Sequence, residues 1–152
     1  LVIANGAIRM DGTSREYLPI EFPAVPDFET TSALKTAAEN LGFTYHIGVV
    51  QAKDSFYGQH SPESSGVSEE LKSKWNSWLK GGCLASEMES GAIFTVAAVR
   101  RLRAGAIFHV VWNQEQEGHG MPQTKVENTD KAIRTAVEAI KILINSDKKQ
   151  EE

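Results

Sequence analysis

Stretches typical of β-strands alternate with stretches typical of α-helices along this chain, and this alternation restricts its fold more than any other feature. Three apolar runs, at residues 1–4, 44–51 and 105–112, are rich in the β-branched and aromatic residues that favour strands. The third run is apolar apart from His109, which is typical of a strand buried on both faces. The order predicts a layered α/β fold with a largely parallel central sheet.

Four helices are expected where apolar residues recur at helical spacing. The first follows Asp27 and the second follows Ser68, and either side chain can cap its helix. The third runs from about Glu87 to about Arg101 and is apolar nearly all round, which is typical of a helix buried between layers. The last helix carries one apolar stripe, formed by Ile133, Val137, Ile140 and Ile144. Three longer segments are expected to be loops: residues 5–27, 54–67 and 113–124.

The overall charge and the residue types exclude several classes of function. The chain has 152 residues, enough for one domain, and its net charge of −4 provides no basic surface for nucleic acid. A single cysteine, Cys83, excludes a disulfide framework or a cysteine metal cluster within the chain. The four histidines lack metal-ligand spacing, and the motifs for acyl transfer, ATP binding and dinucleotide binding are absent. We therefore expect neither a metal nor a cofactor.

The sequence shows no recognisable membrane-spanning or targeting segment. No apolar run reaches the length that spans a membrane, and no signal peptide is present, so we expect a cytoplasmic protein that does not bind membranes. The chain opens in an apolar, strand-like run without an initiator methionine. That opening predicts a fragment of a longer domain.

Ligands of parallel sheets bind at the carboxyl ends of the strands, which directs attention to the loops after Gln51 and Trp112. Residues 53–60 offer a cation, two aromatic rings, a carboxamide and an imidazole. Phe56 or the adjacent tyrosine can stack on a flat heterocycle, and Gln59 presents a donor and an acceptor that match the edge of uracil. The alternative is a polar surface loop anchored by an aromatic residue.

Two carboxylates, Glu87 and Glu89, stand in the expected first turn of the third helix. An ionised carboxylate can accept two hydrogen bonds, and a ribose cis-diol supplies two hydroxyl donors. One of the two is therefore suited to hold a sugar, and simple helix capping is the alternative. Val111 and Trp112 end the third apolar run before Asn113, where they can wall a base pocket or belong to the core.

Several motifs in the same order resemble the uridine branch of the nucleoside phosphorylase superfamily, and the resemblance covers essentially the whole chain. Residues 87–90 (EMES) are similar to the motif that the family places at the ribose. Residues 54–59 (DSFYGQ) resemble the loop DTFYPGQ of the uridine branch without its proline. Four further matches lie in its stretch VRLDGAS…LEFPAV and in the following strand with its exit: residues 8–14, 21–25, 103–105 and 111–113.

The resemblance implies a three-layer αβα fold with a mostly parallel or mixed central sheet that is incomplete in this chain. Residues 1–152 would be the C-terminal part of a single domain whose N-terminal half is absent. The implied activity is that of a pentosyltransferase of pyrimidine salvage, in which phosphate attacks the anomeric carbon of uridine and gives uracil and ribose 1-phosphate. Uridine or a related pyrimidine nucleoside, uracil and phosphate would be its ligands, with phosphate as a co-substrate.

The resemblance also implies roles for individual residues. The implied base-binding residues are Gln59, Phe56, Lys53, His60, Val111 and Trp112. The implied ribose-binding residues are Glu89, Met88 and Glu87, with Glu89 accepting from the sugar hydroxyls. No phosphate-binding residue is expected, because the family holds phosphate in its N-terminal half, and we therefore expect this chain alone to be inactive. The complete enzyme is expected to be a homo-oligomer, either a dimer or a hexamer.

The chain departs from the family pattern at two arginines. Many members have an arginine two residues after the glutamine, facing a base carbonyl, where this chain has Ser61. Another arginine follows the strand-exit asparagine, where this chain has Gln114. We hypothesise that Lys53 or His60 supplies the missing donor. The hypothesis fails if Lys53→Ala and His60→Ala both leave the rate and affinity for uridine unchanged.

Two other functions stay open. Purine nucleoside phosphorylases and nucleosidases usually carry an aspartate after the third strand as a general acid, whereas here Trp112 and Asn113 follow, with no aspartate before Gly120. A non-catalytic nucleoside-binding or storage protein belongs to another class, and it would not need both Gln59 and Glu89. Uridine, deoxyuridine and thymidine all stay possible as substrates.

Overall fold

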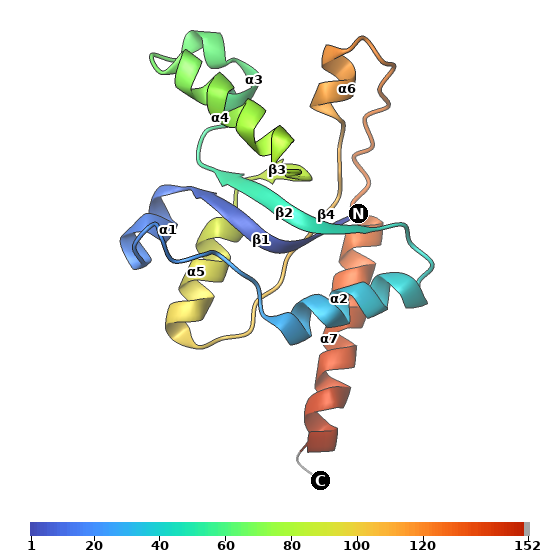
Figure 1. Ribbon diagram of the computed structural model, residues 1–152. Coiled ribbons are helices and arrows are strands. Elements are labelled where there is room, and N and C mark those ends of the chain that lie inside the picture. The colour runs from blue at the N-terminus through green and yellow to red at the C-terminus, as the bar shows by residue number, and fades with distance from the viewer. Residues whose placement is uncertain (151–152) are drawn as a thin grey trace.

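The computed structural model describes residues 1–150, which form one sheet with helices around it (Figure 1). The strands are β1 (Val2–Met10), β2 (His46–Lys53), β3 (Ala85–Glu87) and β4 (Ile107–Phe108). The helices are α1 (Gly12–Tyr17), α2 (Phe28–Asn40), α3 (Phe56–His60), α4 (Ser68–Lys80), α5 (Ser90–Arg100), α6 (Gln114–Gly118) and α7 (Asp130–Gln150). A 3-10 turn, η1 (Pro62–Ser64), lies between α3 and α4.

The sheet has the strand order β3-β2-β1-β4. Strands β1 and β2 run parallel, with Val2 opposite His46 and Met10 opposite Lys53. Strand β3 is parallel to β2, whereas β4 runs antiparallel to β1. The sheet is therefore mixed, and the carboxyl ends of β2 and β3 meet at one edge.

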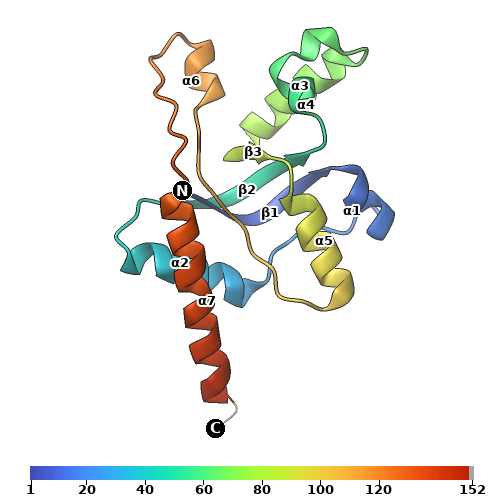
Figure 2. The ribbon, with the colours of Figure 1, turned by 180° about the vertical axis from the view of Figure 1, so that it is seen from behind.

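The two faces of β1 pack against different helices. Val2 and Ala4 join Phe94 of α5 in one buried cluster, whereas Ile3 joins residues of α2 and Ala139 of α7 in another. Successive residues of a strand point to opposite faces, which explains this separation. Both views show α2 beside α7, with α5 apart from them and near α1 (Figure 1 and Figure 2). The expected three-layer αβα arrangement is confirmed.

Two helices turn apolar residues to the solvent. The stripe on α7 is 47–58% exposed at each of its members, which are Ile133, Val137, Ile140 and Ile144. The buried face of α7 consists of the smaller residues Ala132, Thr135 and Ala139. The helix α5 buries Phe94 but leaves Ile93 and Val99 exposed, so the expectation that α5 is buried between layers is wrong for this chain. Within residues 1–150, no helix combines the length and the apolarity needed to cross a bilayer.

Several elements differ from those expected from the sequence. Strand β1 continues to Met10 through residues expected to be a loop, because β2 pairs with it to that point. The short helices α1, α3 and α6 also lie in expected loops, and each begins after a capping side chain, namely Asp11, Ser55 and Asn113. The third apolar run contributes only the two residues of β4 to the sheet, and residues 110 and 111 are exposed. Strand β3 was not expected, and it delays the start of α5 to Ser90.

Two caps were expected, and one is present. Asp27 caps α2 by accepting a hydrogen bond from the backbone nitrogen of Thr30 at 2.8 Å. Ser68 is instead the first residue of α4, and Val67 occupies the cap position without a side-chain hydrogen bond. Glutamates 69 and 70 in the first turn of α4 offer favourable charge there instead.

A buried arginine closes the segment between β1 and α2. The guanidinium of Arg9 donates hydrogen bonds to the Ser14 hydroxyl and to the carbonyl oxygens of Ser14, Leu18, Pro19 and Phe22. These contacts use all five N–H groups that a guanidinium has. Arg9 therefore holds the loop in place and has no donor left for an anion.

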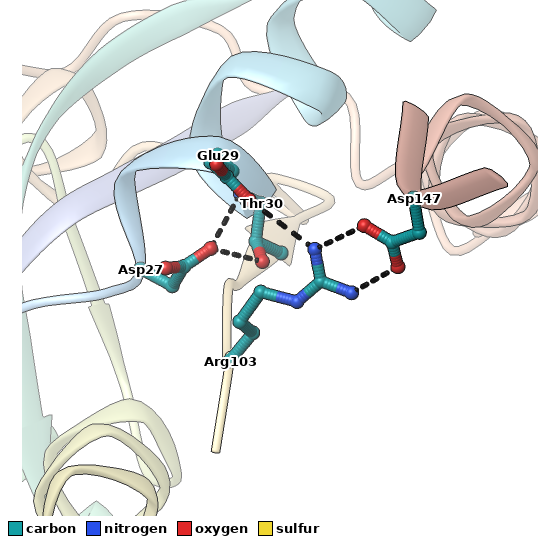
Figure 3. Close-up of polar contacts among 5 residues, drawn as sticks. All are labelled: Asp27, Glu29, Thr30, Arg103 and Asp147. Carbon is teal, nitrogen blue, oxygen red and sulfur yellow. Dashed lines mark hydrogen bonds and ion pairs between the residues drawn. The ribbon is translucent and has the colours of Figure 1, made fainter. Parts of the chain in front are cut away.

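A second arginine joins three elements at the surface (Figure 3). Arg103, in the loop after α5, donates to Asp147 of α7 at 2.9 and 2.5 Å and to Glu29 of α2 at 3.2 Å. The hydrogen bond to Arg103 lowers the pKa of Asp147, and the same contact raises the pKa of Arg103. This bridge fixes the end of α7 against the start of α2.

Candidate functional site

A cavity of about 450 Å³ opens at the carboxyl ends of β2 and β3. Its walls come from α3, α4, β3 and residues 108–115, and helices α3, α4 and α6 stand above the sheet in Figure 1. The residues expected to bind base or ribose all line this one cavity: Lys53, Phe56, Gln59, His60, Glu87, Met88, Glu89, Val111 and Trp112. The structure thus brings the expected site residues together, and their individual roles stay predictions.

One wall of the cavity is aromatic. The rings of Phe56 and His60 lie 4.1 Å apart between centroids, and those of His60 and Trp112 lie 5.3 Å apart, both tilted by less than 40°. Burial, and then the positive charge of Lys53, lower the pKa of His60, against an opposing effect of Glu117. A flat aromatic surface of this kind can stack against a heterocyclic base.

The floor of the cavity is polar and centres on Lys53, which is only 6% exposed. Its ammonium donates to the hydroxyl of Ser86 at 2.5 Å. The Ser86 hydroxyl in turn lies 2.5 Å from Oε1 of Gln59 and 2.9 Å from Oε1 of Gln51. Gln59 then donates through Nε2 to Oε1 of Gln114 at 2.8 Å. Burial lowers the pKa of Lys53, and the nearby charges of Glu87 and Glu89 oppose this effect.

The two carboxylates of the EMES segment have different surroundings. Glu87 is buried at the end of β3, and its carboxylate accepts from the backbone nitrogens of Glu89 and Ser90 at 2.7 and 2.8 Å and from the Ser90 hydroxyl. Glu87 therefore caps α5. Glu89 is exposed, and the one hydrogen bond that its carboxylate makes within residues 1–150 is a 3.2 Å contact from the backbone nitrogen of Met88. The capping alternative thus applies to Glu87, and Glu89 is the carboxylate available to a ligand.

A hydrogen bond across the mouth of the cavity joins α4 to α6. The indole nitrogen of Trp75 donates to Oε1 of Glu115 at 2.7 Å. Asn113 caps α6 by accepting from the backbone nitrogen of Gln116 at 3.0 Å. The ammonium of Lys125 lies 5.2 Å from the ring centre of Trp112, within the range of a cation–π contact. The hydrogen bond between Trp75 and Glu115 therefore connects the two sides of the cavity.

A second cavity, of about 370 Å³, lies behind the polar floor. It shares Lys53, Gln59, Gln114 and two tryptophans with the first cavity, so these residues form the partition between the two. The rest of its lining includes Met10, Leu71 and Gln51.

Sequence reasoning missed two residues of the polar floor, Ser86 and Gln51. They lie opposite each other in the parallel ladder between β2 and β3. Strand β3 has three residues, too short to show the alternation that identifies a strand, so the sequence carried no signal for this pairing. Among residues 1–150, no group of three or more His, Cys, Asp or Glu side chains is arranged to hold a metal ion.

Comparison with known proteins finds relatives that are named uridine phosphorylase or guanosine phosphorylase. The chain is 54% identical over 147 residues to a uridine phosphorylase of Treponema pallidum (strain Nichols), covering 97% of this chain and 57% of that protein. It is 35% identical over 147 residues to a uridine phosphorylase of Escherichia coli (strain K12), with coverages of 95% and 58%. A guanosine phosphorylase of Halorubrum lacusprofundi is 34% identical over 150 residues, with coverages of 94% and 58%.

The chain spans less than two thirds of the length of each of these relatives. Residues 1–146 match the family model described as the phosphorylase superfamily. That match takes in all four strands and every residue of the candidate site. The chain belongs to the phosphorylase superfamily.

Proposed function

We propose that this chain carries the base- and ribose-binding part of a uridine phosphorylase. In the proposed reaction an oxygen of phosphate bonds to the anomeric carbon of uridine while the bond from that carbon to N1 of uracil breaks. The electron pair of the broken bond stays on uracil, which then takes up a proton, and the sugar leaves as ribose 1-phosphate. Phosphate is a co-substrate in this scheme, and no cofactor takes part.

The observation that carries this proposal is the convergence of the expected site residues on one cavity. The base would stack along Phe56, His60 and Trp112, with its polar edge towards Gln59. The free carboxylate of Glu89 would accept hydrogen bonds from the ribose hydroxyls, next to Met88. Aromatic, carboxamide and carboxylate groups thus match the three parts of a pyrimidine nucleoside.

Lys53 is the group proposed to help the base leave. Negative charge grows on uracil as the glycosidic bond breaks, and a nearby cation stabilises that charge more in the transition state than in the substrate. Ser86 engages one of the three N–H groups of the Lys53 ammonium, which leaves two for a base carbonyl. Lys53 would in this way stand in for the arginine that the family has where this chain has Ser61.

Phosphate binding is proposed to need residues beyond this chain. Arg9 is a buried cation, but all five of its donors are engaged by the loop that it holds. The relatives are longer than the part that this chain matches, which leaves room for a phosphate site in the remainder. A cytoplasmic location and assembly as a homo-oligomer stay predictions.

The test is uracil release from uridine by the full-length gene product, with and without phosphate. Phosphate-dependent release from uridine, with no release of base from inosine or guanosine, is the expected result. Release without phosphate would mean a hydrolase. Binding of uridine without any release would favour the non-catalytic nucleoside-binding protein.

A purine nucleoside is the second candidate substrate, because the guanosine phosphorylase of Halorubrum lacusprofundi is 34% identical to this chain. A purine base benefits from a general acid at its five-membered ring, and the strand exit here offers Trp112 and Asn113 instead. Uracil does not need such an acid, which favours the pyrimidine substrate. Phosphate-dependent release of guanine or hypoxanthine in the same assay would reverse this preference.

A further inference from the structure

We propose that Ser86 is a positioning residue that fixes which way the carboxamide of Gln59 faces, so that the pocket accepts a uracil ring and rejects a cytosine ring. Ser86 would do so by linking the buried ammonium of Lys53 to Gln59. This inference rests on the proposed function, because it takes Gln59 to read the base edge. It adds a source of selectivity in a residue that acts on the base through Gln59.

The direction of the hydrogen bonds follows from the Lys53 ammonium. An ammonium donates and cannot accept, so Ser86 must accept in the 2.5 Å contact with Lys53. The one hydrogen of the Ser86 hydroxyl is then free for a carboxamide oxygen. The contact with Gln59 is 2.5 Å and that with Gln51 is 2.9 Å, so the shorter bond runs to Gln59.

Gln59 is held at its other end as well. Its Nε2 donates to Oε1 of Gln114 at 2.8 Å, so oxygen and nitrogen of the carboxamide each have a partner. Turning the carboxamide over would give up the bond from Ser86 and, with Gln114 in its observed orientation, bring two amide oxygens, of Gln59 and Gln114, against each other. Unmatched polar groups are costly away from water, and Gln59 and Ser86 are both partly buried.

The position of Lys53 supports a role for this contact. A lysine is rarely buried without a partner of opposite charge, and Lys53 is 6% exposed. None of the ion pairs found within residues 1–150 includes it. Its observed hydrogen bond goes to Ser86, which the register of β2 and β3 places opposite Gln51. The backbone pairing of two strands thus sets the geometry of the contact.

A fixed carboxamide distinguishes the two pyrimidines. Uracil presents N3–H between two carbonyl oxygens, whereas cytosine presents an unprotonated N3 beside an amino group. A carboxamide that places its oxygen against N3–H and its nitrogen against the carbonyl at C4 meets two mismatches with cytosine, whose C4 carries the amino group. The carboxamide would have to turn over to fit cytosine, and the contacts from Ser86 and Gln114 oppose that turn. Sites that pair with the polar groups of a substrate discriminate strongly against analogues with the wrong ones.

The experiment compares inhibition constants of uracil and cytosine against uridine phosphorolysis by the full-length gene product. The variants are Ser86→Ala and Ser86→Thr, with Ser77→Ala as a control, because Ser77 is an exposed serine of α4 outside both cavities. The ratio of the two constants does not depend on how much of each preparation is folded. A substitution that only lowers the amount of folded enzyme therefore leaves the ratio unchanged.

We expect Ser86→Ala to reduce the preference for uracil over cytosine by about 10-fold, the usual effect of one lost hydrogen bond. Ser86→Thr keeps the hydroxyl and should retain most of the preference, and Ser77→Ala should match the wild type. An unchanged ratio in Ser86→Ala, in an enzyme that does release uracil from uridine, would overturn the role of Ser86 and leave the proposed function standing. A wild-type enzyme that releases no uracil would overturn the proposed function and this inference with it.

Discussion

The carboxylates of Glu87 and Glu89 lie two residues apart in the chain but differ in what they contact. Both carboxylate oxygens of Glu87 accept hydrogen bonds at the start of α5. The carboxylate of Glu89 lines the cavity and accepts a single, longer hydrogen bond from the backbone. Glu89→Gln should lower kcat/KM for uridine by about 10- to 100-fold with little change in unfolding, because a charged acceptor for the sugar hydroxyls is lost. Steady-state kinetics and urea denaturation of the same variant check both parts.

The neighbouring substitution provides the matched control. Glu87→Gln removes the charge from the cap of α5 and should lower the free energy of unfolding by about 1–2 kcal/mol. If Glu87→Gln reduced activity without loss of stability while Glu89→Gln left activity unchanged, the two roles would have to be exchanged.

Gly91, at the start of α5, is predicted not to tolerate substitution by a residue with a side chain. A Cβ at Gly91 would lie 2.4 Å from Oδ2 of Asp11 and 2.9 Å from the Cβ of Ala52. Asp11 cannot easily move aside, because its other oxygen accepts from the backbone nitrogen of Ser14 at 2.6 Å and caps α1. Gly91→Ala should therefore lower the free energy of unfolding by about 1–3 kcal/mol through overpacking.

Gly66→Ala is the control for that measurement, because a Cβ there would meet no atom within 4 Å. It should change the free energy of unfolding by less than about 0.5 kcal/mol. Equal effects of the two substitutions in urea denaturation would show that the space around Gly91 is not the cause.

The candidate site could be predicted from the sequence where motifs carry it. The segments around Phe56, Gln59 and Glu89 resemble family motifs, and the structure brings them to one cavity. Ser86 and Gln51 could not be found in this way, because they lie 35 residues apart in the chain and their contact depends on the register of two parallel strands. A hydrogen bond across a sheet leaves no trace in the local pattern of either strand.

At the scale of elements, α7 offers a comparison between its two faces. Ile140 is 56% exposed and Ala139 is 2% exposed, although they are adjacent. In this chain Ile140→Lys should change the free energy of unfolding by less than about 0.5 kcal/mol, as surface substitutions usually do. Ala139→Asp places an unpaired charge in the core and should destabilise by about 3 kcal/mol or more.

Thermal or urea unfolding of the 152-residue chain checks this pair. Strong destabilisation by Ile140→Lys in the chain alone would mean that the apolar stripe of α7 is already packed against another protein surface.

The bridge at Arg103 predicts a response to acid. The hydrogen bond from Arg103 lowers the pKa of Asp147 in the folded state, so this contact stabilises above the pKa of the unfolded aspartate. The stabilisation is lost in acid, as the pH falls below the ordinary aspartate pKa of about 4 and through the lowered folded pKa. Both side chains are exposed, so the effect should be small and should shrink further in salt.

Acid titration of wild type and Arg103→Gln, followed by the helical circular dichroism signal, tests this expectation. The variant should lose less stability across that window than the wild type does. Identical acid profiles at low salt would show that the bridge does not contribute.

Helices and strands with a clear apolar spacing in the sequence were predicted well. Those whose length depends on pairing with a neighbouring strand were not. The helix after Asp27 and the strand ending at Lys53 follow their caps and apolar spacing closely. The run at residues 105–112 has the composition of a buried strand, yet only Ile107 and Phe108 pair with β1. Composition signals a preference for extended backbone, whereas the length of a strand depends on how far its partner follows it.

At the scale of the whole molecule, Lys53 is the only lysine or arginine among the described residues that line the larger cavity. Under the proposed function, the 152-residue chain alone should release no uracil from uridine at any phosphate concentration, whereas the full-length gene product should. Chromatographic measurement of uracil over hours distinguishes the two. Phosphate-dependent release by the chain alone would contradict the prediction and place a phosphate site within residues 1–150.

The distribution of one residue type has a practical consequence. The chain has three tryptophans, Trp75, Trp78 and Trp112, and all of them line the larger cavity. Indole fluorescence responds to the polarity and the charges around the ring. The tryptophan emission of this chain therefore originates entirely at the walls of the larger cavity, and it can report the arrival of a ligand without any added label.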